Sequence, residues 1–486
     1  MMTLRNNLHR LLIGCVLLSA SACVPTVVTR KERAVTPDQY ALATSDSANS
    51  ATVNWREFFR DPYLTALIDT ALSNNQEYNI VMQEIQIARN EIGARKGEYL
   101  PFLSLNAGAG VDKVGRYTRA GAVEENLEIA PEKAFPEPLG DLMLSANVSW
   151  EADIWRKLRN ARKAAAHRYL ASIEGRNFLV THLVAEIASS YYELMALDNQ
   201  LAILRRNIEI QTNALEIVRL EKQAAKVTEL AVRRFEAEVL KNRSTQFDIM
   251  QQITETENRI NFLVGRYPQP VQRSDQDFAL LVPPVVQAGI PSQLLMNRPD
   301  IRRAEQELAA AKLDVKSARA NFYPNIRITA GAGYNAFNTS FFFKSPASLI
   351  YSAAGELMAP LINRNAIKAY YNSANARQIQ GVYNYERSIL NAYVEVVNQM
   401  SNINNLGQSY ALRQQQVDAL NQSINISTGL FKSARADYME VLLTQRDALE
   451  SRFELVETRM RQMNAMINLY QALGGGWNRN PQDLGR

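Results

Sequence analysis

The chain has 486 residues, of which 47% are hydrophobic and 21% charged, so it can bury a large core and is not of the disordered class. Its 54 basic and 49 acidic residues leave a formal net charge of only +5, and the two signs are interleaved along the chain. This balance, without a basic cluster, predicts no nucleic-acid partner.

Cysteine and histidine are scarce in this chain. The two cysteines are Cys15 and Cys23, and the three histidines are His9, His167 and His182. The body after residue 23 therefore can form neither a disulfide nor a cysteine-based metal site. We also find no Ser/His/Asp arrangement, no glycine-rich phosphate loop and no metal-ligand spacing. The sequence predicts that the protein is not an enzyme and uses no cofactor or metal.

The first 22 residues have the pattern of a bacterial export signal. Arg5 and Arg10 precede an apolar run at 11–18, which is too short to span a bilayer. Small residues at 19–22 then lead to Cys23. This arrangement predicts a lipoprotein processing site, at which Cys23 is acylated and becomes the first residue of the mature chain.

Two other interpretations of this segment remain open. Ala20 stands where lipoprotein signals usually have leucine, and Cys15 has the better local pattern but almost no apolar run ahead of it. The segment is also compatible with an ordinary secretory signal that carries no lipid. Val24 is compatible with sorting to the outer membrane, and residues 23–53 are predicted to form a lipid-anchored tether.

The chain contains an internal repeat at a fixed offset of 223 residues. Setting Asn74 against Asn297 brings further identities into register over about 37 residues without a gap. We predict two copies of one helix–hairpin–helix unit, at 54–270 and 271–477, followed by a C-terminal tail at 478–486. The aligned identities are Gln83-Glu84 with Gln306-Glu307, Ala88 with Ala311, Pro101 with Pro324, and 107–110 with 330–333; at a shifted offset, Tyr191 and Glu193 match Tyr393 and Glu395.

Each copy is predicted to contain a β-hairpin, at 102–153 and at 325–360. The preceding helix ends at Pro101 or Pro324, and a residue before proline favours extended geometry. Along 142–151 apolar residues alternate with polar ones, which is typical of a strand with two different faces. The outer strands are expected near 102–112 and 348–359.

Long helices are predicted after each hairpin. Residues 176–264 contain neither glycine nor proline, and a reversal near 224–228 would give two helices packed as a coiled-coil hairpin. The same layout is expected from about 364 to 473, with a reversal near 433–437.

No segment after residue 23 offers 18 uninterrupted apolar residues, so any membrane crossing must be made by strands. Four strands cannot close alone, because their outer edges would leave backbone groups unpaired in hydrocarbon. Three chains would supply twelve strands. The predicted fold is α+β, a trimeric 12-stranded outer-membrane β-barrel with four strands per chain that continues into a long periplasmic α-helical coiled-coil barrel. The alternative is a helical bundle carrying two small β-hairpins.

Several motifs occur in an order that is typical of one family. They are Trp55, Phe58, Asp61-Pro62, Leu64, Leu67-Ile68, Ala71-Leu72 and Asn74-Asn75 in the opening segment; Trp150-Glu151 and Asp153-Ile154-Trp155 at a strand-to-helix junction; Leu295, Arg298-Pro299-Asp300-Ile301 and Glu305 in the second copy; and Gly474-Gly475-Gly476-Trp477 near the end. With these motifs, residues 18–477 resemble the TolC-like outer membrane factors, and most closely the lipoprotein subgroup of resistance-nodulation-division efflux pumps.

The resemblance implies a function and a set of partners. Such a protein is the outer-membrane channel of a tripartite efflux pump, and it passively conducts small molecules. It forms a homotrimer, contacts outer-membrane lipid, and docks a periplasmic adaptor and an inner-membrane resistance-nodulation-division pump, which supplies the energy. The alternative within channels is the outer-membrane component of a type I protein secretion system. The exported compounds are not implied, because specificity in this family belongs mostly to the pump.

The resemblance also implies a periplasmic gate just after the last helical reversal. Glu440 stands where the family has its first gating aspartate and Leu443 where it has the second, while Phe431 replaces the gating tyrosine. Together with Asp437 these residues predict a constriction that is more hydrophobic than in the family. The alternative is that Asp437 and Glu440 are solvated acids at a helix start, where the dipole favours them.

Two aromatic groups have simpler interpretations. Trp55 and Phe58 are expected to pack the N-terminal segment onto the helices. Residues 341–343 are three phenylalanines between the third and fourth strands, and they fit either a lipid-interface anchor or packing under a loop. The polar stretch 113–137 is expected to be the other external loop.

Overall fold

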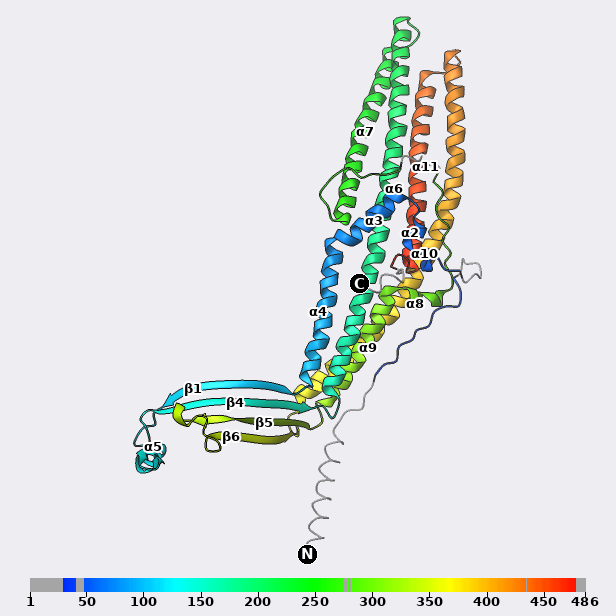
Figure 1. Cartoon of the computed structure of the whole chain (residues 1–486). Coiled ribbons are helices and arrows are strands. Elements are labelled where there is room, and N and C mark those ends of the chain that lie inside the picture. The colour runs from blue at the N-terminus through cyan, green and yellow to red at the C-terminus, as the bar shows by residue number, and fades with distance from the viewer. Residues whose placement is uncertain (1–28, 41–47, 275–277, 279–280, 434, 478–486) are drawn as a thin grey trace. The chain divides into compact units, whose positions relative to one another are not determined.

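The computed structural model describes residues 29–40, 48–274, 278, 281–433 and 435–477, and it repeats one succession of helices, paired strands and long helices (Figure 1). The predicted signal peptide, Cys23 and the tail at 478–486 lie outside these residues. The helices are α2 (Trp55–Phe58), α3 (Pro62–Asn74), α4 (Gln76–Glu98), α5 (Arg119–Asn126), α6 (Lys157–Gln223), α7 (Glu229–Val264), α8 (Leu294–Asn297), α9 (Pro299–Ala320), α10 (Asn365–Lys432) and α11 (Tyr438–Ala472). The strands are β1 (Phe102–Asp112), β2 (Glu128–Ala130), β3 (Lys133–Ala134), β4 (Leu139–Ala152), β5 (Asn325–Ala336) and β6 (Leu349–Met358).

The chain divides into two compact units, and each unit combines segments from both predicted copies. We call them the strand unit and the helical unit. Of the described residues, the strand unit comprises 29–31, Gln86–Leu170 and Gln306–Val382, and the helical unit comprises those within Glu32–Ile85, Ala171–Glu305 and 383–477. The boundaries of the two sequence copies therefore differ from the boundaries of the two compact units.

The strand unit contains one four-stranded antiparallel sheet in the order β1-β4-β5-β6. Both predicted hairpins are confirmed, and pairing of β4 with β5 joins them into this single sheet, as the ribbons show (Figure 1). Strands β1 and β6 each have a strand neighbour on one side only, so they are the two edges of the sheet. Representative register pairs are Phe102 with Ser149, Leu142 with Ala336, and Asn325 with Met358.

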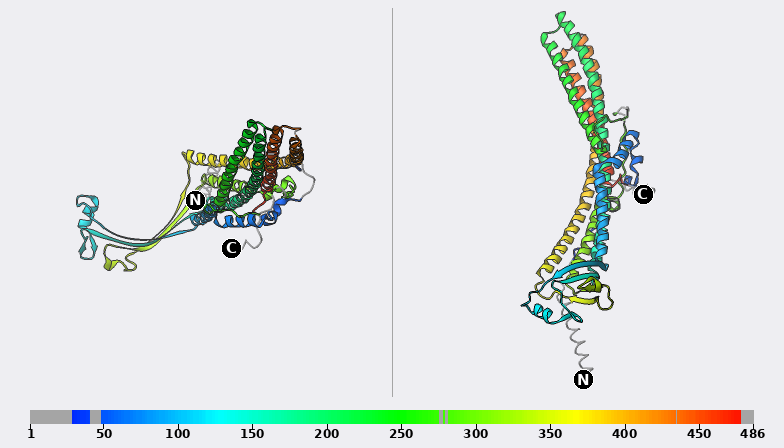
Figure 2. Two further views of the ribbon diagram at one scale, coloured as in Figure 1. Left: turned by 90° about the horizontal axis from the view of Figure 1, so that it is seen from above. Right: turned by 60° about the vertical axis from the view of Figure 1, so that its left-hand side comes forward.

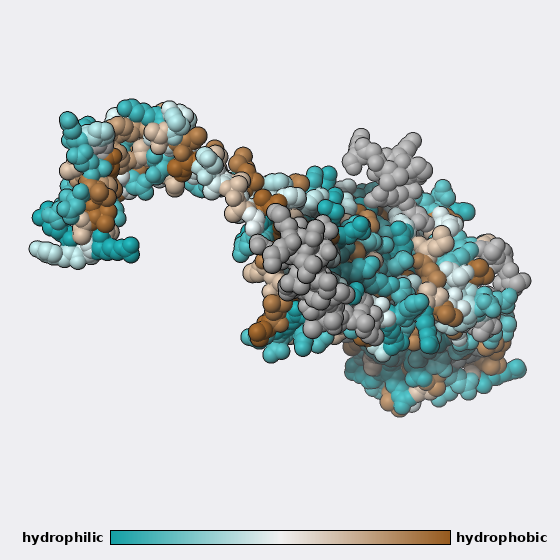
Figure 3. Space-filling model, turned by 90° about the horizontal axis from the view of Figure 1, so that it is seen from below, coloured by the Kyte–Doolittle hydropathy of each residue, from teal (hydrophilic) through white to brown (hydrophobic). Residues whose placement is uncertain are grey.

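The register gives the sheet one apolar and one polar face. Leu144 of β4 pairs with Ala107 of β1 and Tyr334 of β5. Val148 of β4 likewise pairs with Leu103 of β1 and Ala330 of β5. Rows one residue away carry polar side chains such as Asn147. The alternation predicted for β4 thus extends to β1 and β5, whereas β6 has the apolar residues Ile350 and Met358 on its other face as well. In Figure 3, hydrophobic residues lie among polar ones over this part of the molecule. Exposed apolar residues on this face are Leu103, Leu105, Leu144, Trp150, Ile328, Leu349, Tyr351 and Leu357.

The stretch 113–137 is more ordered than the predicted loop. It contains α5 and the short antiparallel pair of β2 and β3. The Thr118 hydroxyl caps α5 by accepting the backbone N–H of Gly121 at 3.2 Å. The phenylalanines at 341–343 lie in the other connection, where Phe343 packs edge-on against Tyr334 and Phe342. Phe343 remains 69% exposed, so both interpretations of this cluster stay open.

Two tryptophans fix the point where strands turn into helices. The Trp150 indole N–H donates to the Tyr99 carbonyl at 3.0 Å, and the Trp155 indole donates to the Pro324 carbonyl at 2.7 Å. The Asp153 carboxylate caps α6, because it accepts the backbone N–H groups at the helix start from Leu158 and Arg159. The junction motif recognised in the sequence therefore consists of side chains that close the exposed backbone groups of a strand-to-helix turn.

The two predicted helical reversals are confirmed. α6 ends at Gln223 and α7 begins at Glu229, while α10 ends at Lys432 and α11 begins at Tyr438. Both lie at the same end of the helical hairpins (Figure 1). At the first one, the Lys226 N–H donates to Glu221 O at 2.9 Å while Ala225 adopts a left-handed φ of 56°, which is a Schellman-type helix end. No helix within the described ranges is long and apolar enough to cross a membrane.

The main core of the helical unit lies where α3 packs against α6, α7 and α11. Ile68, Ile187, Tyr191 and Ile260 are almost completely buried there. The packing predicted for the opening segment is confirmed, since Trp55 is 5% exposed and the Phe58 ring stacks on Tyr470 with 4.1 Å between ring centroids. Other fully buried residues of this core from α3 and α6 are Leu64, Ala71, Ala188 and Leu194.

One backbone contact occurs in both copies. Gly265 follows α7 with a φ of 75°, and a Cβ built there would lie 2.5 Å from Asn74 O. Gly474 follows α11 with a φ of 90°, and its Cβ would lie 2.5 Å from Asn297 O. Asn74 and Asn297 are the residues that align at the offset of 223. The end of each long helical hairpin therefore contacts the first helices of its own copy, at a position where only glycine fits.

This contact generates a stability prediction. Gly265→Ala should lower the free energy of unfolding by at least about 1 kcal/mol, because alanine disfavours a positive φ and its Cβ would meet the Asn74 backbone. Thermal unfolding of the purified protein in detergent measures the change. Gly407→Ala within α10 is the matched control; its Cβ would meet no atom within 4 Å, and we expect a gain of about 0.5–1 kcal/mol. Equal melting temperatures for the two variants would contradict the prediction.

Candidate functional site

The predicted gate residues lie around the second helical reversal. Asp437 is the N-cap residue of α11, and its backbone carbonyl accepts the Glu440 N–H at 3.1 Å, although its side chain makes no capping hydrogen bond. Glu440 and Leu443 are exposed, and they follow Asp437 at intervals of three residues, so the three share one face of α11. Phe431 is half-buried in the last turn of α10, before the reversal. The structure thus groups three of the four predicted residues on one helix face.

The opposite face of α11 is held by apolar packing. Leu442 belongs to a buried cluster with residues of α6 and α7, which we call the tip cluster. Arg234 of α7 also places its guanidinium 3.3 Å from the Met439 sulfur. This packing fixes which face of α11 presents Asp437, Glu440 and Leu443. The buried members of the tip cluster are Leu215, Val218, Ala231, Val232, Phe235, Val239 and Leu442.

The charged groups at the two reversals are arranged differently. At the first reversal, Glu229 pairs with Lys222 at 2.5 Å and with Arg233 at 2.8 Å, and the hydrogen bond from Lys222 lowers the pKa of the Glu229 carboxyl. At the second reversal, neither Asp437 nor Glu440 forms an ion pair with any residue that the structure describes. Their side chains therefore lack an oppositely charged partner among the described residues, in contrast to Glu229.

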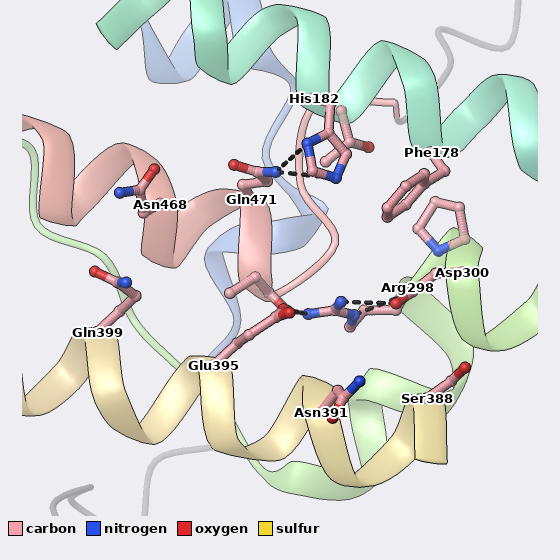
Figure 4. A pocket seen from close by; sticks show the side chains of 13 residues that line it. Phe178, His182, Arg298, Asp300, Ser388, Asn391, Glu395, Gln399, Asn468 and Gln471 are labelled. Atoms are coloured by element: carbon pink, nitrogen blue, oxygen red, sulfur yellow. Dashed lines mark hydrogen bonds and ion pairs between the residues drawn. The ribbon is translucent and has the colours of Figure 1, made fainter. Parts of the chain in front are cut away.

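A second cluster of charges surrounds Arg298, the first residue of the Arg-Pro-Asp motif. Its guanidinium donates to both oxygens of Asp300 at 2.9 and 2.7 Å, to Glu395 at 2.6 Å and to the Ala472 carbonyl at 2.8 Å (Figure 4). The Arg298 side chain is only 7% exposed. It therefore ties the start of α9 to α10 and to the last turn of α11. The sequence motif had been recognised, but this role depends on partners from two distant segments, Glu395 and Ala472.

A cavity of about 430 Å³ opens beside this cluster. His182 lines it from α6, with its Nδ1 2.9 Å from the Gln471 amide nitrogen, and burial together with the Arg298 guanidinium lowers the pKa of His182 (Figure 4). The imidazole is therefore neutral near pH 7. Nowhere in the described part of the chain do three or more His, Cys, Asp or Glu residues gather in a way that could hold a metal ion. The other polar residues that line this cavity are Thr181, Asp300, Ser388, Asn391, Glu395, Gln399 and Asn468.

The Arg298 cluster is a diverged form of a simpler contact in the first copy. At the aligned position Asn75 donates its side-chain amide to the Leu263 carbonyl at 2.9 Å, just as Arg298 donates to the Ala472 carbonyl. In the second copy the amide is replaced by a guanidinium, which adds ion pairs to the same helix-end contact. Glu395 of the second copy therefore pairs with the buried Arg298. Glu193, which aligns with Glu395 in the first copy, pairs with the half-exposed Arg259.

Comparison with known proteins identifies the family. The model of the outer membrane efflux protein family matches residues 67–266 and 290–475. The chain belongs to this family. The two matched segments fall within the two predicted copies, and they contain the strands, both reversals and the Arg298 cluster. The protein is thus an outer-membrane efflux channel with the α+β fold of the TolC-like proteins, as the sequence predicted.

Individual relatives match over nearly the whole chain. The pyoverdine export outer membrane protein OpmQ of Pseudomonas aeruginosa is 28% identical over 479 residues, covering 98% of each protein. SilC of Salmonella typhimurium, described as a probable outer membrane lipoprotein, is 27% identical and covers 96% of this chain and 97% of SilC. The structure of the Neisseria gonorrhoeae MtrE outer membrane channel in its open state superposes with a TM-score of 0.81 at 22% identity, over 94% of this chain and 99% of MtrE.

The Arg298 cluster generates a second prediction. Arg298→Ala should lower the free energy of unfolding by about 1–3 kcal/mol, because it leaves the buried Ala472 carbonyl and the partly buried Asp300 carboxylate without this donor. Arg259→Ala is the matched control from the first copy, where both partners are partly exposed and we expect a loss below about 1 kcal/mol. Chemical unfolding of both variants measures the difference. Similar losses in the two would show that the Arg298 pairs contribute no more than surface pairs.

Proposed function

We propose that the protein is the exit duct of a tripartite efflux pump and works as a homotrimer. In this proposal, a periplasmic adaptor and an inner-membrane resistance-nodulation-division transporter deliver small molecules, which the duct conducts passively. The observation that carries the proposal is that both units of a single chain end in two unpartnered edges, at which a further copy fits.

In the strand unit the edges are β1 and β6. β6 runs antiparallel to β5 and β5 antiparallel to β4, so a β1 strand from a second copy can continue the antiparallel order beside β6. The backbone groups at both edges must be paired if the apolar face lies in hydrocarbon. Three copies of the four-stranded sheet give twelve strands, an even number as is usual for bacterial barrels.

In the helical unit the edges are α7 and α10, which flank the row α7-α6-α11-α10 in two views (Figures 1 and 2). On α7 the side chains of Leu240 and Phe247, seven residues apart, are 60% and 69% exposed. On α10 the side chains of Leu412 and Ile426, fourteen residues apart, are 67% and 61% exposed. Apolar residues at multiples of seven form one stripe on a helix in a coiled coil. A head-to-tail contact between these stripes closes a ring.

The relatives favour small molecules as the cargo. OpmQ is named for pyoverdine export, and neither it nor SilC is named for protein secretion. This supports an efflux pump over the alternative of a type I protein secretion system. The polar cavity wall near His182 and the absence of a described metal cluster give no reason to assign one particular compound.

We also propose that Cys23 carries a lipid that anchors the mature chain to the outer membrane. Cys23 lies outside the described residues, so the support comes from the signal pattern and from the description of SilC as a lipoprotein. Residues 29–40 have no helix or strand, as expected for a tether. Tyr40 at their end is 3% exposed and stacks on Tyr393 of α10 at 5.5 Å, so this part of the tether is docked on the helical unit.

The trimer is tested by engineered cysteines, because residues 24–486 contain none. Leu103→Cys on β1 should cross-link to Leu357→Cys or Ala353→Cys on β6 of a neighbouring copy, since these positions share the apolar face near the same end of the sheet. With a short thiol cross-linker on intact outer membranes, we expect covalent dimers and trimers in denaturing gels.

The matched control combines Leu103→Cys with Leu349→Cys at the other end of β6, which should yield little product. Each cysteine alone should yield none. The proposed closure would be excluded if the variants with Leu103→Cys and either Leu357→Cys or Ala353→Cys reach the outer membrane but yield only monomers in the gels. Mass spectrometry of the same preparation tests the anchor, because we expect the mature chain to begin at an acylated Cys23 and Cys23→Ser to remove that acyl mass.

The gate is tested separately by conductance in planar bilayers. If Glu440 belongs to the closed constriction, Glu440→Ala should raise the single-channel conductance and weaken cation preference, because a threefold ring of carboxylates is lost. Glu457→Ala is the matched control, since Glu457 is also an exposed acid of α11 but pairs with Arg461 far from the reversal. Unchanged conductance and selectivity in Glu440→Ala would support the alternative of a solvated helix-start acid.

A further inference from the structure

A layer of buried amide side chains crosses the helical unit below the tip cluster. Gln211 of α6 is fully buried, Asn242 of α7 is 4% exposed and Gln445 of α11 is 7% exposed. On the other side of the layer lies a second apolar cluster, which we call the middle cluster. It consists of Leu197, Leu201, Leu204, Ile249 and Leu449.

The two apolar clusters fix the level of each amide. On α11, Gln445 comes three residues after Leu442 of the tip cluster and four before Leu449 of the middle cluster. On α6, Gln211 lies between Leu215 of the tip cluster and Leu204 of the middle cluster. With a rise of about 1.5 Å per residue, both amides are roughly 4.5–6 Å from the tip cluster along their helix axes. They therefore lie at the same height in the bundle.

The hydrogen bonding of this layer is incomplete. The Asn242 amide donates to Gln211 Oε1 at 2.6 Å. The remaining donor of Gln211, Nε2, and the acceptor of Gln445, Oε1, have no hydrogen-bond partner among the described residues. The same holds for Nδ2 of Asn207, one helical turn from Gln211 on the same face of α6. A buried amide without a partner is costly, so such groups are rare unless a second arrangement satisfies them.

The unpaired groups are complementary. At this level α6 offers the Nε2 donor of Gln211 and α11 offers the Oε1 acceptor of Gln445, so a small axial shift or rotation of α11 would let Gln445 accept from Gln211. Polar residues within a coiled-coil core are known to set the register of one helix against another. α11 also carries Glu440 and Leu443 on its first two turns, and Asp437 is its N-cap residue. A register change of α11 would move all three together.

We propose that Gln445 is a positioning residue for the gate, and that it selects between two registers of α11 against the α6–α7 hairpin. One register has the Asn242–Gln211 bond alone, and the other adds a bond from Gln211 Nε2 to Gln445 Oε1. The proposal rests on the proposed function, because it assumes that the tip opens and closes. It goes beyond that function by assigning the equilibrium to a layer that touches neither cargo nor partner.

The test is a double-mutant cycle on channel opening. Gln445→Met and Gln211→Met remove the hydrogen-bonding groups while they keep side-chain length. One hydrogen bond contributes about 1 kcal/mol, so each variant should shift the ratio of open to closed channels in planar bilayers about fivefold, in the same direction. The double variant should shift it no further than either single one, because both remove the same bond. Melting temperatures are measured in parallel, and Asn242→Leu serves as the structural control.

The outcomes separate the possible roles. Non-additive shifts in opening support the proposal, provided that Asn242→Leu combined with Gln445→Met is additive. If Gln445→Met changes only the melting temperature, or if the two shifts add, the layer is structural and the proposal is wrong. A shift by Gln445→Met together with no effect of Glu440→Ala would keep the positioning role and reject only the gate residue. Monomeric protein in the cross-linking experiment would reject the proposed function independently of either result.

Discussion

Pairing of β4 with β5 is the interaction on which the rest of the strand unit depends. It joins the hairpins of the two copies into one sheet in which apolar side chains share a single face from Leu103 to Tyr351. The same pairing leaves β1 and β6 as edges whose backbone groups need partners. In water these edges would be tolerable, but in hydrocarbon each unpaired group costs several kcal/mol, so the sheet of a single chain is incomplete as a membrane structure. The helical unit in turn leaves the apolar stripes on α7 and α10 exposed.

Duplication explains why the two halves solve one structural problem with different chemistry. The close approach of a glycine to an asparagine carbonyl is preserved in both copies, because any side chain at Gly265 or Gly474 would collide with backbone atoms. The neighbouring position is free to change as long as it can donate to a helix-end carbonyl. An asparagine amide does so at position 75 and an arginine does so at position 298. Only the arginine forms ion pairs, with Asp300 and Glu395, so the second copy has a cluster of charges beside a polar cavity.

The charged and polar groups near the tip also differ between the reversals. Ion pairs between Lys222, Glu229 and Arg233 occupy the first reversal, whereas the acids of the second reversal are without ion pairs among the described residues. Beneath them the amide layer of Gln211, Asn242 and Gln445 interrupts an otherwise apolar core. A continuous apolar core would have been more stable, and polar residues that remain in such a core commonly specify register at a cost in stability.

The sequence by itself determined the elements whose signals are local. Alternation of apolar and polar residues placed the strands, and the absence of glycine and proline at 176–264 placed the first pair of long helices. The offset of 223 residues revealed the duplication, and the recurrence of the same layout placed the second pair of long helices. The order of motifs also identified the family that the comparison then established. Tertiary structure alone decided that Arg298 joins Glu395 and the Ala472 carbonyl, and that Gln211 and Gln445 lie at one height in the bundle. These relations join residues 97 to 234 positions apart, and periodicity reports only which face of its own helix a residue occupies, not which distant residue faces it.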